Sequence, residues 1–165
     1  QAATLLDIGG QDTKAIALLP GGRVGRFEMN DRCAAGTGKF LEYVATAFGL
    51  SVEAFAALAL TGDDPPLISS MCTVFAETEA TTLMARGVSQ ANIALGLHKA
   101  VAGRTLAMLG RVGLTPPVVF VGGVAKNPCL VRLVAEAVGG EVLVPEAPDM
   151  TGALGAALWL AAETA

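Results

Sequence analysis

The sequence predicts an α/β protein in which a mixed sheet begins with a three-stranded meander and is covered by helices. Apolar residues run in short, strand-like segments up to residue 29 and then recur at helical spacing. After that point single strands alternate with helices, an order typical of a mixed sheet. Hydrophobic residues make up 53% of the 165 residues and charged residues 16%, which is enough apolar material for a folded core.

The meander is expected at 4–8, 13–19 and 23–29. Two glycine-rich turns, Gly9-Gly10 and Pro20-Gly21-Gly22, separate the three strands. The remaining segments are delimited by glycine, proline and residues that cap helices. They are a helix around 40–48, a second from Ser51 to 60, an extended piece at 67–69, a helix from Cys72 to 86, a long helix after Ser89, a strand at 118–121, a helix from Asn127, a strand at 141–144 and a last helix around 152–157.

Composition excludes several classes of function. A net charge of −4 without clustered Lys or Arg argues against nucleic-acid binding. No stretch reaches the ~18 apolar residues of a membrane-spanning helix, so no membrane association is expected. Three widely spaced cysteines are a poor disulfide framework and indicate a reducing, cytoplasmic location. The chain opens with Gln1 on a strand-like run, and we expect residues 1–165 to be one domain of a longer protein.

A carboxylate and two glycines follow the first expected strand, in the segment Asp7-Ile8-Gly9-Gly10-Gln11-Asp12-Thr13-Lys14. Backbone N–H groups in such a turn can cradle phosphate oxygens, and Asp7 could hold hydrated Mg²⁺. The same residues also suit an ordinary hairpin with Asp12 in the turn. Alone, this segment leaves both interpretations open.

A second diglycine turn follows the strand at 118–121. Gly122-Gly123 is expected to lead into a helix whose N-terminus favours an anion or a nucleotide. Finding both turns in one domain favours nucleotide binding over plain structure. The segment 36–39 is not a Walker A loop, because Phe40 and Cys33 stand where Ser or Thr and the first Gly belong, and Leu41 breaks the dinucleotide fingerprint.

Two cysteines each precede a predicted helix. At a helix N-terminus the dipole favours the thiolate that binds iron, so Cys33 and Cys72 are candidate iron ligands. Two thiolates cannot complete a Cys₄ set, and any cluster must be shared between two chains. The alternative is that both are small core residues. Cys129 is expected in the core, and the lone His98 to be structural or solvated.

Taken together, five motifs resemble the activator ATPases of 2-hydroxyacyl-CoA dehydratases and the ATPase subunits of benzoyl-CoA reductase. They lie in order along nearly the whole chain, at 7–14, 29–38, 72–77, 122–127 and 152–157. The resemblance implies the actin, Hsp70 and sugar-kinase (ASKHA) superfamily fold, with ATP in a cleft between two lobes. This chain would be the C-terminal lobe, without the N-terminal one.

The resemblance also implies site residues and partners. Asp7 and Gln11 would be catalytic and would contact the phosphates and Mg²⁺ together with Gly9 and Gly10, while Gly122, Gly123 and Lys126 would line the adenosine side. Cys33 and Cys72 of each chain would hold one 4Fe-4S cluster in a homodimer. A ferredoxin or flavodoxin would donate the electron, and a CoA-ester dehydratase or reductase would accept it. The chain departs from the expected pattern at Asp149, where relatives should carry Gln.

Two other functions fit the same sequence. A redox-silent sugar or acyl kinase-like ATPase lobe would keep the nucleotide site and bury both cysteines in the core. Alternatively, the chain would serve only as a dimerisation and cluster-binding module of a larger enzyme.

Overall fold

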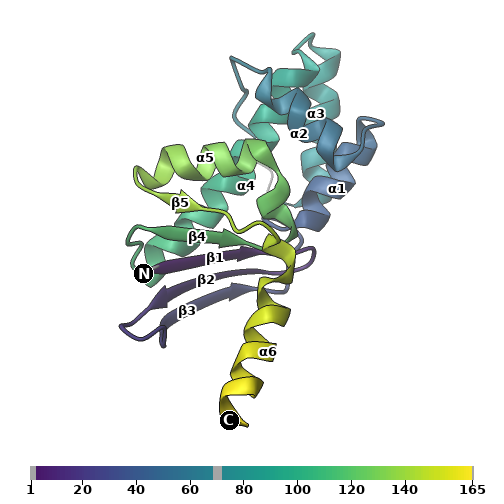
Figure 1. The fold of residues 1–165 in the computed structure, drawn as a ribbon. Helices are drawn as coiled ribbons and strands as arrows, with labels where there is room; N and C mark the ends of the chain where they lie inside the picture. Colours follow the sequence, from purple (N-terminus) through teal and green to yellow (C-terminus); the bar gives the residue numbers. More distant parts are fainter. Residues whose placement is uncertain (1–2, 69–71, 165) are drawn as a thin grey trace.

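Five strands form one mixed sheet in the computed structural model, which describes residues 3–68 and 72–164 (Figure 1). They are β1 (Thr4–Ile8), β2 (Thr13–Leu18), β3 (Val24–Asn30), β4 (Val118–Val121) and β5 (Val142–Leu143). The order across the sheet is β3-β2-β1-β4-β5. The first three strands are antiparallel neighbours, whereas β4 lies parallel to β1 and β5 parallel to β4. The predicted mixed sheet with a meander start is confirmed.

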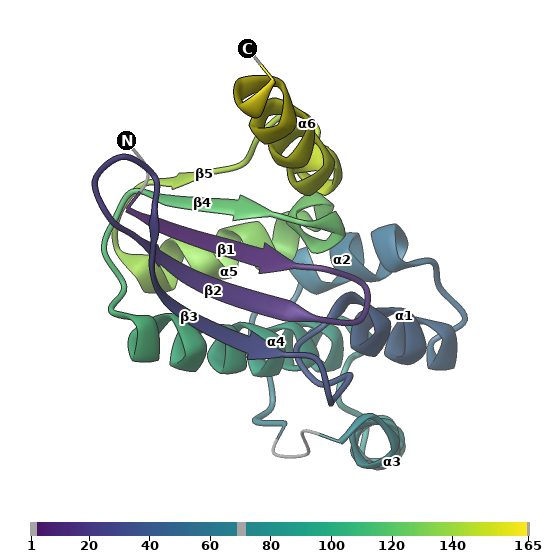
Figure 2. The same cartoon turned by 90° about the horizontal axis from the view of Figure 1, so that it is seen from below.

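Helices cover one face of this sheet and gather beyond the end of β1. They are α1 (Gly38–Ala47), α2 (Val52–Leu60), α3 (Thr73–Ala85), α4 (Gln90–Val112), α5 (Pro128–Val138) and α6 (Thr151–Glu163), with 3₁₀ helices η1 (Gly123–Lys126) and η2 (Pro148–Met150). Figure 2 shows α4 and α5 behind the sheet and α6 apart from it. Among the described residues no single helix is long and apolar enough to cross a bilayer; only the bent pair of α1 and α2 passes the length and composition test.

Three helices begin at the polar residues that the sequence singled out. The side-chain oxygens of Ser51, Ser89 and Asn127 each accept a hydrogen bond from the backbone N–H three residues later, at 3.2, 3.2 and 3.0 Å. Each bond satisfies a helix-end donor and contributes on the order of 1 kcal/mol. The predicted starts of α2, α4 and α5 are therefore confirmed.

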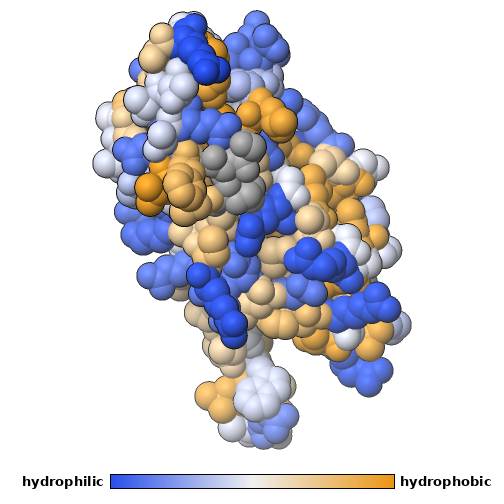
Figure 3. All heavy atoms as spheres, turned by 180° about the vertical axis from the view of Figure 1, so that it is seen from behind, coloured by the Kyte–Doolittle hydropathy of each residue, from blue (hydrophilic) through white to orange (hydrophobic). Residues whose placement is uncertain are grey.

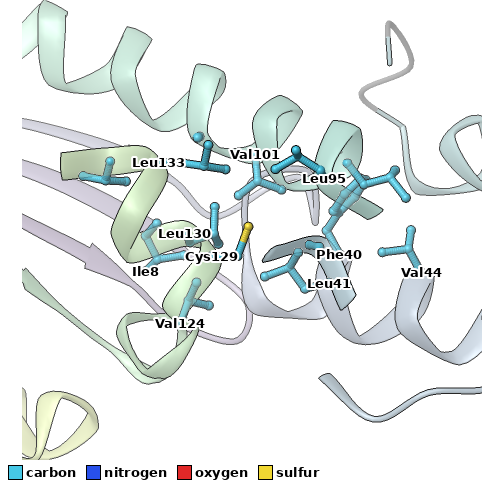
Figure 4. Packing of buried hydrophobic residues seen from close by; sticks show 14 of the residues in the cluster. Ile8, Phe40, Leu41, Val44, Leu95, Val101, Val124, Cys129, Leu130 and Leu133 are labelled. Atoms are coloured by element: carbon cyan, nitrogen blue, oxygen red, sulfur yellow. The ribbon is translucent and has the colours of Figure 1, made fainter. Parts of the chain in front are cut away.

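The core lies between the sheet and the helices. Figure 4 shows the sulfur of Cys129 among apolar side chains that include Ile8, Leu41 and Leu130. Cys129 is fully buried, and burial raises the pKa of its thiol to about 11. A thiol held protonated at neutral pH packs as a small hydrophobe, which confirms the predicted core role of Cys129.

The extended piece expected at 67–69 is not assigned to a strand at Leu67 and Ile68, and its third residue, Ser69, lies outside the described residues. The second diglycine turn leads first into η1, and α5 starts only at Pro128. A 3₁₀ turn therefore separates Gly122-Gly123 from α5, and the predicted helix start at Asn127-Pro128 is confirmed.

Candidate functional site

Parallel pairing of β1 and β4 brings the two diglycine turns to the same edge of the sheet. Asp7, next to last in β1, is paired with Val121, the last residue of β4. Gly9-Gly10 and Gly122-Gly123 therefore leave neighbouring strands side by side, although more than 100 residues separate them in sequence. The carboxyl ends of adjacent parallel strands are where open α/β sheets bind ligands.

Glycine is required where these segments approach each other. Gly122 has a φ of 85°, and a Cβ there would overlap the carbonyl oxygen of Ile8 in β1. At the start of α1, the N–H of Gly38 donates to the carbonyl oxygen of Gly9 at 2.8 Å. A Cβ on Gly38 would lie 3.1 Å from that same oxygen. Close backbone packing thus binds both α1 and β4 to the turn after β1.

A cleft of about 400 Å³ opens between the two turns and helices α1 and α2. Its walls consist of Gly10, Gly38, Leu41, Glu42, Val52, Glu53, Ala56, Gly123, Val124, Lys126, Asn127 and Pro128. The glycine turns contribute backbone to the lining, and α1 and α2 contribute the apolar residues Leu41, Val52 and Ala56 as well as the carboxylates Glu42 and Glu53. A lining of polar backbone and apolar side chains suits a ligand with a charged group and a flat ring.

Of the predicted nucleotide residues, the structure places three in the cleft wall, namely Gly10, Gly123 and Lys126. Asp7, Gly9, Gln11 and Gly122 lie in the strand end and turns beside it. The wall contributed by α1 and α2, including Glu42 and Glu53, was missed. Nothing in the local sequence of these helices distinguishes a cleft-lining residue from any other helical surface residue.

Lys14 lies between two carboxylates, that of Asp7 at the end of β1 and that of Asp12 after the first diglycine turn. The ammonium nitrogen of Lys14 lies 2.7 Å from Asp12 Oδ1 and 3.6 Å from Asp7 Oδ2. Partial burial lowers the pKa of Lys14, but the hydrogen bond to Asp12 and the two carboxylate charges outweigh it and raise the pKa above its usual value. Because Lys14 is hydrogen-bonded most closely to Asp12, the Asp7 carboxylate keeps coordination capacity for a hydrated Mg²⁺ beside phosphates.

Lys126 makes an exposed ion pair at the rim of the cleft. Its ammonium nitrogen lies 2.8 Å from Asp149 Oδ2, and the hydrogen bond from Lys126 lowers the pKa of Asp149. An exposed pair of this kind contributes little free energy. Lys126 can therefore exchange Asp149 for an anionic ligand at small cost, and Asp149 occupies the position where Gln was expected.

Cys33 and Cys72 are both exposed. Cys72 is the N-cap of α3, as predicted. The prediction that Cys33 lies at a helix N-terminus was wrong, because the N-cap of α1 is Thr37, four residues later. A turn closed by the N–H and hydroxyl of Thr37 on the carbonyl oxygen of Ala34, at 3.0 and 2.7 Å, stands between Cys33 and the helix.

The two cysteines flank one hollow between α1 and α3. Ala34 and Thr73, the residues that follow them, both line this hollow of about 600 Å³. Within residues 3–68 and 72–164, no group of three His, Cys, Asp or Glu side chains could hold a metal ion. Two exposed thiols are too few for a complete Cys₄ site, so a cluster held by them would need two further ligands from outside this chain.

His98 is structural. It is fully buried on α4, where its Nδ1 lies 2.8 Å from the carbonyl oxygen of Ala94 and its Nε2 lies 3.1 Å from the amide nitrogen of Asn127. Asn127 also caps α5 and lines the cleft. The histidine therefore supports the cleft from behind rather than entering it.

Comparison with known proteins agrees with this geometry. The profile of the BadF/BadG/BcrA/BcrD ATPase family matches residues 1–160. The activator of lactoyl-CoA dehydratase from Anaerotignum propionicum is 48% identical over 158 residues, 96% of this chain and 61% of that protein. The solved activator of 2-hydroxyisocaproyl-CoA dehydratase from Clostridium difficile, with bound ADPNP, is 42% identical, with a TM-score of 0.91 over 96% of this chain and 59% of that chain.

The similarity to the ethanolamine utilization protein EutJ from Carboxydothermus hydrogenoformans is evidence for the fold of this chain and for nothing else. EutJ is 15% identical, with a TM-score of 0.52 over 90% of this chain and 46% of that chain. The predicted actin-like ATPase fold is confirmed. The chain spans about 60% of the length of the dehydratase activators that it matches.

Proposed function

This chain belongs to the BadF/BadG/BcrA/BcrD ATPase family, and from that membership we propose that its parent protein is an ATP-dependent one-electron activator of a CoA-ester dehydratase or reductase. The observation that carries the proposal is the combination of two sites in one lobe. One is the cleft between the diglycine turns, and the other is the pair of exposed cysteines beyond α1. The similar activators named for dehydratases support the acceptor class.

ATP is proposed for the cleft. Gly10 and Gly123 line the cleft with backbone, Gly9 lies in the same turn as Gly10, and Asp7 and Gln11 stand beside them to hold Mg²⁺ and orient water. Gly122 and Lys126 belong to the second turn and its rim. The apolar wall on α1 and α2 gives the adenine ring a surface. The similar solved activator contains ADPNP, which supports this ligand class.

A 4Fe-4S cluster is proposed for Cys33 and Cys72 of two chains in a homodimer, and such a group supplies one-electron transfer when bound. Both thiols are exposed, as ligands shared across a two-fold axis must be. Cys72 is also the N-cap of α3, so its thiol stands at the exposed start of that helix.

The proposal extends to the whole protein. Residues 1–165 are proposed as the C-terminal lobe of a two-lobed cytoplasmic ATPase, since they span 61% of a similar activator. A ferredoxin or flavodoxin is proposed as the electron donor.

Asp7→Asn is expected to weaken binding of an ATP analogue roughly tenfold or more when Mg²⁺ is present, because it removes the carboxylate proposed to hold the hydrated ion. Isothermal titration of the full-length protein with and without Mg²⁺ checks this. Asp12→Asn is the matched control, since it removes the same charge from the other side of Lys14. Equal losses in the two variants would show that Asp7 acts only through Lys14.

Cys33→Ser and Cys72→Ser are each expected to abolish iron binding. The full-length protein purified without oxygen should carry about two irons and two sulfides per chain, half of a shared 4Fe-4S cluster, and should be dimeric. Iron analysis and mass in solution measure both properties.

Cys129→Ala is the matched control, because this thiol is buried away from the other two. It should keep its iron. A wild-type protein that takes up no iron during anaerobic reconstitution would remove the electron-transfer proposal and leave a redox-silent ATPase lobe.

A further inference from the structure

Positive charge is concentrated on α4. The chain has 15 acidic and 11 basic residues and a net charge of −4. Nevertheless, the 23 residues of α4 include Lys99, Arg104 and Arg111 and no acidic residue. A local excess of one sign on a protein of the opposite net charge is a feature of surfaces that steer charged partners.

These cations form a continuous surface with the edge strand β3. Arg104 and Arg111 line a hollow of about 360 Å³ together with Met29 and Asn30 of β3. Arg111 Nε lies 3.2 Å from Glu28 Oε2. Arg26, two residues before Glu28 in the strand, projects to the same face of the sheet.

The surface continues past Arg104 along α4. Lys99 and Arg104 line a second hollow, of about 560 Å³, whose opposite wall includes Pro65, Pro66 and Leu67. Because Arg104 lines both hollows, they adjoin. We call Arg26, Lys99, Arg104 and Arg111 the basic stripe. Figure 3 views the molecule from behind, the side on which α4 lies, where hydrophilic side chains interrupt an apolar surface.

Three of the four cations of the basic stripe form no ion pair within the part of the chain that the structure describes. Arg26, Lys99 and Arg111 are exposed and Arg104 is half-buried. Across residues 3–68 and 72–164, only Arg111 among the four forms an ion pair. Beside them, Leu67 is 90% exposed. Unpaired cations next to an exposed apolar side chain are typical of an interface with an acidic protein more than of a phosphate-binding groove.

One end of the basic stripe meets the loop that carries Cys33. The amide nitrogen of Asn30, which lines the first hollow, donates to the carbonyl oxygen of Cys33 at 2.9 Å. Gly36 of the same loop lies against Arg104, since a Cβ on Gly36 would be 3.0 Å from Arg104 Cδ. A protein seated on the stripe would therefore stand next to a proposed iron ligand.

We propose that the basic stripe is the docking surface for an acidic one-electron carrier protein that reduces the cluster, an inference that rests on the function proposed above. One electron leaves the reduced centre of the carrier, which is oxidised, and enters the oxidised cluster. No bond or proton is exchanged. Charge complementarity would speed the encounter and set the orientation of the carrier beside Cys33.

The test uses the full-length, iron-loaded protein and a reduced bacterial two-cluster ferredoxin as the probe. Two double variants, Arg104→Glu/Arg111→Glu and Arg26→Glu/Lys99→Glu, each reverse two charges of the stripe. The second pair keeps the fold testable, because both side chains are exposed and neither touches the Cys33 loop in any contact described above. Arg86→Glu/Arg132→Glu makes the same change in net charge and serves as the control. Both residues are exposed; Arg86 caps the C-terminus of α3, and Arg132 lies on α5, where it forms an ion pair with Glu136.

Stopped-flow reduction by ferredoxin at low salt should slow about tenfold or more in both stripe variants and little in the control. Reduction by dithionite, iron content and ATPase activity should stay unchanged. Ferredoxin rates that match the control, with the same salt dependence, would overturn the inference while leaving the proposed function intact. A single-stranded oligonucleotide is the second probe. If the two stripe variants lose binding to it while their rates of reduction by ferredoxin stay unchanged, the inference is also overturned. Absence of iron in the wild type would instead refute the proposed function.

Discussion

The Gly122→Ala variant is expected to lose roughly 3–5 kcal/mol of unfolding free energy, which is much of the total stability of an ordinary domain. Part of this loss is the cost of a φ of 85° with a ψ of 169° for a residue with a Cβ, a region adopted almost only by glycine, about 1–3 kcal/mol. The remainder is steric. The new methyl group would overlap the carbonyl oxygen of Ile8, and only separation of β1 from β4 would relieve the overlap.

The Gly87→Ala variant shows the cost of a positive φ without a steric overlap. Gly87 has a φ of 83°, close to that of Gly122, but a Cβ there would meet no heavy atom within 4 Å. Its expected loss is therefore only about 1–2 kcal/mol. Thermal unfolding followed by circular dichroism should show a midpoint lower by about 10 °C or more in Gly122→Ala. Equal midpoints in the two variants would contradict the close approach of the turn to β1.

Features decided by neighbouring residues were predictable from the sequence. Ser51, Ser89 and Asn127 start helices because a short polar side chain reaches the backbone N–H three residues later, whatever the rest of the chain does. The diglycine turns were equally local, since only glycine suits such backbone. Their meeting was not local: it depends on β4 pairing with β1 rather than with another strand. The sequence of either segment alone does not show which distant strand it will pair with.

The errors and omissions at the candidate site also concern features that depend on how distant parts of the chain pack together. Cys33 was placed at a helix N-terminus because a predicted helix follows it, but a turn closed by the Thr37 hydroxyl separates Cys33 from the start of α1 at Gly38. The apolar wall of the cleft could not be identified, because Leu41 and Val52 come from two helices whose relative placement depends on the core. The basic stripe was also missed. Lys99, Arg104 and Arg111 are spaced along α4, and Arg26 of β3 joins them only because α4 packs beside β3.

Acidification is expected to destabilise the protein through His98, its only histidine. Burial lowers the pKa of His98 to about 4, against a smaller opposite effect of the hydrogen bond to the Ala94 carbonyl. The unfolded chain, with a histidine pKa near 6.5, binds the proton more readily. The contribution of neutral His98 to stability is thus complete above about pH 6.5 and falls as pH drops toward 4, by about 3 kcal/mol in all.

The geometry explains why the proton is excluded. Asn127 Oδ1 accepts the N–H of Leu130 as the cap of α5, so its amide nitrogen must face His98 Nε2 as a donor. A protonated imidazole would place a second donor there. Turning the amide around would satisfy it only by breaking the cap, which costs on the order of 1 kcal/mol. Either response moves Asn127, a residue of the cleft wall.

The chemical shift of the single imidazole, followed by NMR during acid titration, should have a midpoint near 4 if His98 is held neutral in the folded protein. A midpoint near the unperturbed value of about 6.5 would contradict the buried network. Urea unfolding provides a second measure. His98→Leu should be less stable at neutral pH because the Asn127 amide loses its acceptor, yet its stability should fall less on acidification, so that the two curves converge toward pH ~4.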